Sequence, residues 1–247
     1  MLRLWRHRLS SSSRSSLSSL LDRVPSQCAV CRAWPARPVC DACVTRFAPL
    51  VTRCGRCALP LPAGVAHCGE CITRPPPLDA CLAACAYAWP WPDCIAQFKF
   101  QGRAGWAAPL ATLLRSAPWV EPALEQADLV LPMPLATGRL RERGFNQAHE
   151  LARRLAPGKT DARLLLRIRE TPAQSGLSRA ERLRNLQGAF ALEPLRAEAV
   201  RGRRIVLVDD VMTSGASLFS AAQVLRTGGA AHITAIVLAR TELPAAG

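Results

Sequence analysis

Residues 205–218 read Ile-Val-Leu-Val-Asp-Asp-Val-Met-Thr-Ser-Gly-Ala-Ser-Leu, and this stretch decides the fold. Its first four residues are apolar and mostly β-branched, as in a central parallel strand that is buried on both faces. Two acids, Asp209 and Asp210, follow the apolar run, and a short turn then opens a helix. Because ligands of open α/β sheets bind at the carboxyl ends of the strands, the pattern predicts a binding site here.

The turn at residues 213–217 combines hydroxyl side chains with a glycine at the start of a helix, which suits a phosphate monoester. The two carboxylates beside it could hold the two hydroxyls of a ribose, so the stretch predicts a ribose 5-phosphate site. The acids could instead cap the turn, but two consecutive acids at the end of a buried strand are costly without a partner. The Walker loop and the dinucleotide fingerprint are excluded, because neither glycine pattern is present here.

From Leu78 onward the chain alternates short apolar strands with helices, which is the signature of a parallel α/β sheet flanked by helices. We expect Asp93 to be the N-cap of the helix that it begins, and Ser178 with Glu181 to form a capping box. The expected strands are 80–87 at the sheet edge, 129–132, 164–168, 205–209 and 233–239, and the expected helices are 93–100, 106–115, 145–155, 178–185 and 217–226.

Eight of the eleven cysteines form four Cys-x-x-Cys pairs, a spacing typical of metal sites. Each pair can supply two thiolates, so the pairs predict two closed, structural Zn²⁺ sites. Iron–sulfur clusters are the alternative, because they use the same ligands. A cross-braced arrangement would join the first pair with the third, whereas adjacent pairing would give the sets Cys28, Cys31, Cys40, Cys43 and Cys54, Cys57, Cys68, Cys71.

These patterns divide the chain into three regions. Residues 1–27 form a low-complexity extension that is rich in Arg and Ser. Residues 28–77 form a double zinc ribbon, which has too few aliphatic residues for a core of its own and must be organised by metal. Residues 78–247 form the sheet domain. Cys81, Cys85 and Cys94 fall in this last region, where we expect them to be buried as small hydrophobic residues.

The formal net charge is +14, and it comes almost entirely from arginine, since Lys99 and Lys159 are the only lysines. Such a charge favours a polyanionic partner, although the composition of a GC-rich genome would explain it equally well. No apolar stretch approaches the roughly 18 residues of a membrane helix, so we expect a protein without a membrane span. A thiol-rich metal site fits a reducing compartment and predicts a cytoplasmic location. The composition of residues 1–27 leaves a mitochondrial transit peptide open.

The 205–218 stretch resembles the signature of type I phosphoribosyltransferases, which is four hydrophobic residues, two acids and a Thr/Ser-Gly-x-Thr/Ser loop. The resemblance is closest to the ComF/GntX branch and covers roughly residues 18–240, including the cysteine pairs. It is carried by Pro-Met-Pro-Leu at 132–135, Arg-Leu-Arg-Glu-Arg-Gly-Phe-Asn-Gln-Ala at 139–148, Gln174-x-x-Leu177-Ser178 and Arg182-x-x-Asn185-Leu186-x-Gly188-Ala189-Phe190. The chain departs from it where Ser214 and Ser217 replace commoner threonines and Met133 a commoner valine.

The resemblance implies a ligand, 5-phosphoribosyl 1-pyrophosphate (PRPP) with Mg²⁺, and a role for each matching residue. Asp209 and Asp210 would be catalytic and contact the ribose hydroxyls. Arginines and Mg²⁺ would neutralise the pyrophosphate as it leaves an oxocarbenium-like ribose. We expect Arg153, Arg154 and Arg163 to be solvated instead. The implied PRPP-binding residues, besides the two acids, are Thr213, Ser214, Gly215, Ala216, Ser217, Arg139, Arg143 and Arg167.

Two functional hypotheses follow from the resemblance and the charge. The first is a PRPP-binding enzyme of the phosphoribosyltransferase class, which transfers phosphoribose to an acceptor that the sequence does not identify. The aromatic candidates for contacting such an acceptor are Trp89, Trp91 and Phe100. The alternative is a nucleic-acid-associated accessory factor in DNA uptake and transformation, which uses the fold to sense a ligand or to handle DNA. Its partners would be single-stranded DNA or the uptake machinery. A purely structural zinc-ribbon scaffold would leave Asp209 and Asp210 unexplained.

Overall fold

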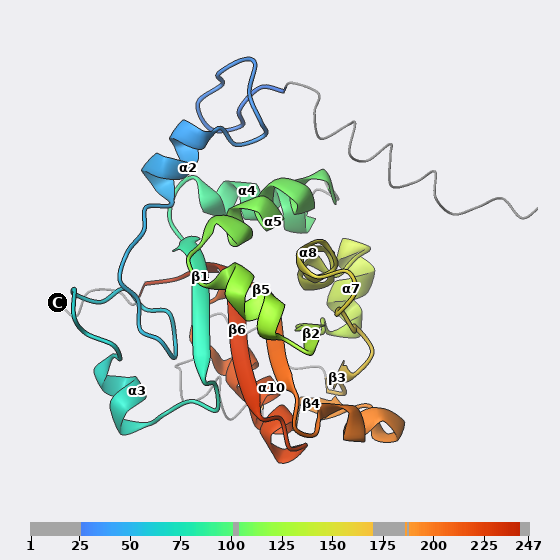
Figure 1. Ribbon diagram of the computed structural model, residues 1–247. Coiled ribbons are helices and arrows are strands. Elements are labelled where there is room, and N and C mark those ends of the chain that lie inside the picture. The colour runs from blue at the N-terminus through green and yellow to red at the C-terminus, as the bar shows by residue number, and fades with distance from the viewer. Residues whose placement is uncertain (1–25, 101–103, 170–185, 187, 243–247) are drawn as a thin grey trace, which may run out of the picture. The chain divides into compact units, whose positions relative to one another are not determined.

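The computed structural model describes residues 26–100, 104–169, 186 and 188–242. The chain divides into two compact units, Met1–Asp41 and Ala42–Gly247. In the smaller unit, Ser26 and Ala36 form an antiparallel bridge in which Ser26 N donates to Ala36 O at 2.7 Å. The larger unit contains the sheet (Figure 1).

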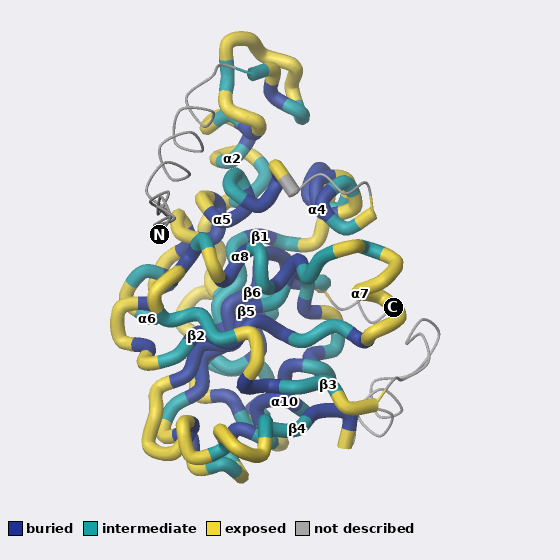
Figure 2. Tube along the Cα trace, turned by 90° about the vertical axis from the view of Figure 1, so that its right-hand side faces the viewer, coloured by how far each residue is buried: buried dark blue, intermediate teal, exposed yellow. Residues whose placement is uncertain are grey.

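The larger unit is built on a parallel four-stranded sheet, as the sequence predicts. The strand order is β1 (Ala80–Ala86), β6 (His232–Arg240), β5 (Arg204–Met212) and β2 (Leu129–Pro132). The two central strands, β5 and β6, are buried along most of their length (Figure 2). Their apolar, β-branched residues are therefore covered on both faces, which is the environment that such a run favours.

Helices cover both faces of this sheet. α5 (Ala107–Ser116) contacts β1 and β6, whereas α10 (Ala216–Thr227), which lies behind the strands in Figure 1, contacts β5 and β6. Ile205 and Leu207 of β5 share one apolar cluster with Leu225 of α10. α8 (Gln147–Leu155) contacts α5 and the strands β2 and β5. The carboxyl ends of β2 and β5 stay open between these helices, and there the pocket forms.

β5 is longer than the sequence predicts. Its expected end was Asp209, but the ladder with β6 continues through Val211, opposite Ala239, and Met212, opposite Arg240. The expectation was wrong because the neighbouring strand, β6, also extends further than its apolar core suggests. As a result the two acids lie within a paired strand, which holds their backbone rigid.

Several helix boundaries also differ from expectation. α4 (Trp91–Phe100) begins before Asp93, so Asp93 lies in its first turn and is not its N-cap. A 3₁₀ turn (Ala104–Trp106) precedes α5. α8 begins two residues later than expected, because Asn146 is its N-cap and accepts from His149 N at 3.3 Å.

In the described part of the sheet domain, two α-helices and one strand were not expected at all. α6 (Val120–Gln126) and α7 (Thr137–Arg143) precede and follow β2, and α7 buries none of its residues, so it has no apolar periodicity to detect. β3 (Leu165–Arg167) lies within the expected strand 164–168 and pairs antiparallel with β4 (Phe190–Leu192), which is only three residues long. A 3₁₀ helix (Pro194–Val200) follows β4.

The cysteine-rich part contains two short helices, α2 (Asp41–Phe47) and α3 (Gly69–Thr73). The expected helix at 178–185, with its capping box, and residues 1–25 of the expected extension lie outside the described residues. Among the helices that the structure describes, none is both long and apolar enough to cross a bilayer.

Candidate functional site

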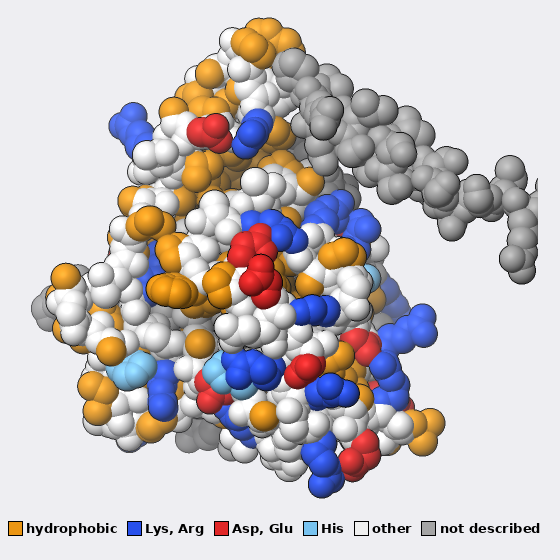
Figure 3. Space-filling view, in the orientation of Figure 1, with side chains coloured by type: hydrophobic (Ala, Val, Ile, Leu, Met, Phe, Trp, Pro, Cys, Tyr) orange, Lys and Arg blue, Asp and Glu red, His pale blue; other side chains and the backbone are white. Residues whose placement is uncertain are grey.

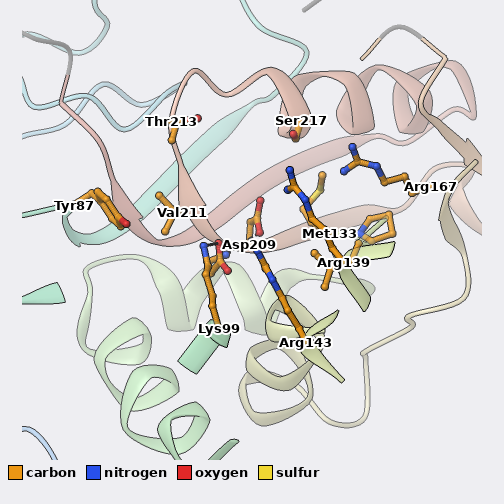
Figure 4. A pocket seen from close by; sticks show the side chains of 13 residues that line it. Tyr87, Lys99, Met133, Arg139, Arg143, Arg167, Asp209, Val211, Thr213 and Ser217 are labelled. Carbon is orange, nitrogen blue, oxygen red and sulfur yellow. Dashed lines mark hydrogen bonds and ion pairs between the residues drawn. The ribbon is translucent and has the colours of Figure 1, made fainter. Parts of the chain in front are cut away.

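A cavity of about 470 Å³ opens at the carboxyl ends of β2 and β5 (Figure 4). Seven of the ten residues that the resemblance assigns to PRPP line it, whereas Ser214, Gly215 and Ala216 form the turn beside it. The seven are Asp209, Asp210, Thr213, Ser217, Arg139, Arg143 and Arg167. Segments far apart in the sequence thus meet at one end of the sheet.

The two acids lie at the centre of this cavity. Asp209 Oδ1 accepts a hydrogen bond from the backbone N–H of Asp210 at 2.9 Å. Asp210 is 8% exposed, and its Oδ1 lies 2.9 Å from Lys99 Nζ. Burial and the neighbouring charge of Asp210 raise the pKa of Asp209 to about 7, although the amide of Asp210 and the charges of Lys99 and Arg143 oppose this shift. Asp209 is therefore a carboxyl group that can gain or lose a proton near neutral pH.

Residues 213–217, which we call the phosphate loop after the prediction from the sequence, follow the acids along the chain and border the cavity. Gly215 has φ +80°, and a Cβ built on it would lie 2.5 Å from Met212 Cε and 2.7 Å from Phe219 Cζ. Only glycine fits this position, because both the backbone angle and the space exclude a side chain. α10 begins directly after it, so the first amides of this helix lie next to Thr213 and Ser217, which line the cavity.

Four cationic side chains from three different elements line the cavity together with the acids. Lys99 comes from α4, Arg139 and Arg143 from α7, and Arg167 from β3 (Figure 4). Against two carboxyl groups, these four cations leave the pocket positively charged at neutral pH. The lining thus suits a ligand with several negative charges, as a pyrophosphate has.

The surroundings of Arg143 also suit an anionic ligand. Its guanidinium lies 5.1 Å from the ring centroid of Phe100, and its Nη1 donates to Gln147 Oε1 at 3.1 Å. Arg143 Nε and Gln147 Nε2 are buried, yet neither has a hydrogen-bond partner among the described residues. Buried donors without partners are costly, so an acceptor from a ligand would complete this part of the site.

Lys99 and Tyr87 were not expected in the site. Lys99 is one of two lysines in an arginine-rich chain and Tyr87 is the only tyrosine, so rarity was the one signal in the sequence. Neither belongs to a recognisable motif. Both lie far from Asp210 along the chain, so no local pattern places them in the site. The expected aromatic candidates, Trp89, Trp91 and Phe100, do not line the cavity.

Arg153 and Arg154 are engaged elsewhere. Both lie in α8 and pair with Glu150 Oε2 at 2.6 Å. Burial alone would raise the pKa of Glu150, but these hydrogen bonds and charges outweigh it and lower the pKa. Arg163 is exposed. None of the three arginines is among the residues that line the cavity.

The cysteine pairs form two groups of four by adjacent pairing, not by cross-bracing. In each group the sulfur atoms all lie within 4.8 Å of one another, and the groups are Cys28, Cys31, Cys40, Cys43 and Cys54, Cys57, Cys68, Cys71. Zn–S bonds of about 2.3 Å in a tetrahedron imply sulfur–sulfur edges of about 3.8 Å. The Sγ–Sγ distance is 3.6 Å for both Cys31–Cys40 and Cys57–Cys68. Both groups could therefore hold zinc.

Backbone amides prepare these sulfur atoms for metal. Cys68 N donates to Cys54 Sγ at 3.3 Å, and Cys40 N donates to Cys28 Sγ at 3.4 Å. Burial raises the pKa of Cys54, but amide hydrogen bonds outweigh it and lower the pKa to about 6, so this sulfur is a ready thiolate. Cys81 and Cys85, outside the groups, are buried as expected, and burial raises the pKa of each to about 12.

Comparison with known proteins agrees with this geometry. A family model described as "Phosphoribosyl transferase domain" matches residues 140–243. The "DNA utilization protein YhgH" of Salmonella typhimurium is 34% identical over 227 residues, which cover 88% of this chain and 98% of that protein. "Competence protein F" of Haemophilus influenzae is 34% identical over 197 residues, which cover 76% and 84% of the two chains. "Competence protein ComFC" of Bacillus subtilis is 34% identical over 114 residues, or 46% of this chain and 45% of that one.

Proposed function

This chain belongs to the ComF family of proteins with a phosphoribosyl transferase domain, and we propose that its pocket binds PRPP together with Mg²⁺. One observation carries the proposal. The acid pair, Thr213 and Ser217 of the phosphate loop, and four cations line a single cavity of about 470 Å³ at the open end of the sheet. Each part of PRPP has a chemically matched group there.

The 5-phosphate would accept hydrogen bonds from the phosphate loop and from the first amides of α10. The ribose diol would donate to Asp209 and Asp210. The pyrophosphate would lie among the pocket arginines and Lys99, where the unpartnered Arg143 Nε supplies a further donor. When bound, Mg²⁺ would supply additional positive charge against the pyrophosphate, with the two carboxylates as the nearest anionic groups of the protein.

The pocket would also support transfer of the phosphoribosyl group. The bond between ribose C1 and the pyrophosphate oxygen breaks, and its electron pair leaves with pyrophosphate. A lone pair of the acceptor forms the new bond to C1, and the acceptor then loses its proton. Arg139, Arg143 and Arg167 would hold the growing charge of the leaving group, while the acid pair would stabilise the cationic ribose.

Calorimetric titration with PRPP and Mg²⁺ tests the binding. We expect PRPP to bind saturably. Ribose 5-phosphate and pyrophosphate should each compete with PRPP, because each would fill one half of the site. Arg167→Ala should weaken PRPP about tenfold or more, through loss of a charged hydrogen bond. Arg153→Ala is the matched control, because its guanidinium pairs with Glu150. Equal affinities for these two variants, or no binding by the wild type, would refute the proposal.

The names of the relatives favour a second role, in the handling of DNA. Lys and Arg side chains gather on the right-hand side of the face in Figure 3, and the net charge is +14. We propose that the protein acts in the cytoplasm on single-stranded DNA that enters the cell. Binding of a labelled oligonucleotide should weaken steeply as salt rises. If the protein binds no DNA at any salt concentration, this role is rejected. The proposed PRPP site would not be affected by that result.

The two cysteine groups complete the proposal as structural zinc sites. Each group supplies four sulfur ligands and therefore leaves no open position for catalysis. Zinc would hold together segments that contain few aliphatic residues, in place of an apolar core. Elemental analysis should return about two zinc atoms per chain, and iron in their place would favour the iron–sulfur alternative.

A further inference from the structure

Arg240 is a buried arginine that the PRPP site does not use. It is the last residue of β6, and it is only 2% exposed. Its guanidinium donates in two directions, toward a cysteine pair and toward the phosphate loop. A buried guanidinium is costly unless its donors are satisfied, so this position calls for a specific explanation.

On one side, Arg240 holds the turn between two metal-site cysteines, residues 54–57, which we call the knuckle. Arg240 Nε donates to Cys57 O at 2.8 Å. A second hydrogen bond joins the knuckle to the sheet, because Cys81 N in β1 donates to Gly55 O at 2.7 Å. Cys54 and Cys57 also belong to the same apolar cluster as β5, β6 and α10. The knuckle is thus part of the core of the larger unit.

On the other side, Arg240 holds the start of the phosphate loop. Its Nη1 donates to Met212 O at 3.1 Å and to Thr213 O at 2.5 Å. Met212 also contacts β1, where Cys81 Sγ lies 3.6 Å from Met212 Sδ. The Met212 side chain in turn occupies the space beside Gly215. A single side chain, that of Arg240, therefore connects the knuckle with the phosphate loop.

We propose that Arg240 is a positioning residue that makes the conformation of the phosphate loop depend on metal at the group Cys54, Cys57, Cys68 and Cys71. The effect on ligand affinity rests on the proposed binding of PRPP, whereas the effect on the loop itself does not.

The dependence follows from geometry. Bonds from a metal ion to Cys54 and Cys57 fix the turn between them, and with it the carbonyl that accepts from Arg240. Without metal those bonds are lost, so the carbonyl that accepts from Arg240 is less constrained. The metal bonds therefore hold Arg240, and through it Met212 O and Thr213 O, in place.

The test compares Arg240→Met with a matched control, Arg53→Met. Arg53 Nη1 donates to Ala58 O at 3.0 Å, so it holds the same ribbon but is not one of the donors to Met212 O and Thr213 O. The first readout is amide hydrogen exchange across the loop and the first turn of α10, where Phe219 N donates to Gly215 O at 2.8 Å. Zinc content is measured on the same samples, and PRPP affinity is measured by calorimetry.

We expect Arg240→Met to keep about two zinc atoms per chain, to raise exchange in the loop at least tenfold and to weaken PRPP about tenfold or more. Arg53→Met should change both properties less than threefold. Arg240→Lys keeps the charge but lacks the fork that reaches both sides, so it should behave like Arg240→Met. This second variant serves if Arg240→Met does not fold.

Metal dependence is tested by adding Cys68→Ser in each background. Removing this ligand should raise loop exchange about tenfold in the wild type but less than threefold in Arg240→Met, because the connection is already broken there. Equal increases in both backgrounds would overturn the coupling, and so would a folded, zinc-loaded Arg240→Met variant whose loop exchanges like that of Arg53→Met. If the wild type binds no PRPP, the proposed function fails, but the exchange data still decide the coupling.

Discussion

Lys99 Nζ lies 2.9 Å from Asp210 Oδ1, and the two side chains are only 17% and 11% exposed. This pair joins the last turn of α4 to the acid pair of β5, so the helix supplies a counter-charge to the centre of the pocket. A nearly buried ion pair is sensitive to the loss of either partner, since the remaining charge is left without compensation. Substitution of Lys99 is therefore a direct test of the proposed site.

Replacing Lys99 by methionine should weaken PRPP about tenfold or more, because a charged donor beside the ligand is lost. It should also raise the pKa of Asp209 further, since the charge of Lys99 now opposes that rise. Calorimetry gives the first effect. The control is Lys159→Met, because Lys159 donates to Leu124 O and Glu125 O and should affect stability alone. Similar losses of PRPP affinity in both variants would show that Lys99 is no ligand contact.

Asp209 should make the free energy of unfolding depend on pH. Its pKa is about 7 in the folded protein and near 4 in the unfolded chain, so between these values the folded state binds more protons. By linkage, this contribution is favourable at pH 4 and is lost as pH rises toward 7. Relative to the wild type, Asp209→Asn should therefore gain stability as pH rises from 4 to 8, by up to about 4 kcal/mol.

Urea unfolding of both proteins at several pH values measures that difference. The same substitution should abolish PRPP binding when combined with Asp210→Asn, since both acceptors for the ribose diol are then weakened. A folded double variant with unchanged PRPP affinity would remove the acid pair from the ribose site. A difference in unfolding free energy that does not vary with pH would contradict the raised pKa.

Gly215→Ala should damage the phosphate loop in two ways. The residue has φ +80°, and its new Cβ would lie 2.5 Å from Met212 Cε and 2.7 Å from Phe219 Cζ. We expect a loss of about 1–3 kcal/mol in stability and of about tenfold or more in PRPP affinity. Gly202→Ala is the matched control, because Gly202 has φ +69° but nothing within 4 Å of the added Cβ. If both variants lose affinity equally, strain in the backbone alone would explain the effect.

The two cysteine groups should differ in what their metal stabilises. Cys54, Cys57 and Cys71 belong to the apolar cluster of the sheet, so Cys68→Ser should lower the melting temperature of the larger unit by several degrees. Cys31→Ser should remove about one zinc atom per chain and leave that melting transition in place. Calorimetric scans with parallel zinc analysis distinguish the two. If the melting transition of Cys68→Ser is the same as that of the wild type, the second zinc site does not support the sheet.

The sequence by itself determined the parallel sheet, the position of the pocket at the end of β5 and the eight cysteines that could hold metal. These features are local, because a β-branched run, two acids and a Gly-containing turn each follow from neighbouring residues. The same holds for the Cys-x-x-Cys pairs, whose spacing alone indicates a metal. Where expectation failed, as in α7 and β4, the segment was exposed or very short and carried no periodic signal.

Only the tertiary structure decided which distant groups meet. Lys99 reaches Asp210 because α4 ends beside the carboxyl end of β5, and Arg240 reaches Cys57 because β6 ends beside the second cysteine group. Adjacent pairing of the cysteines was likewise open until their positions were known. Contacts of this kind depend on how separate elements pack against one sheet, and packing is a property of the whole chain that no local pattern encodes.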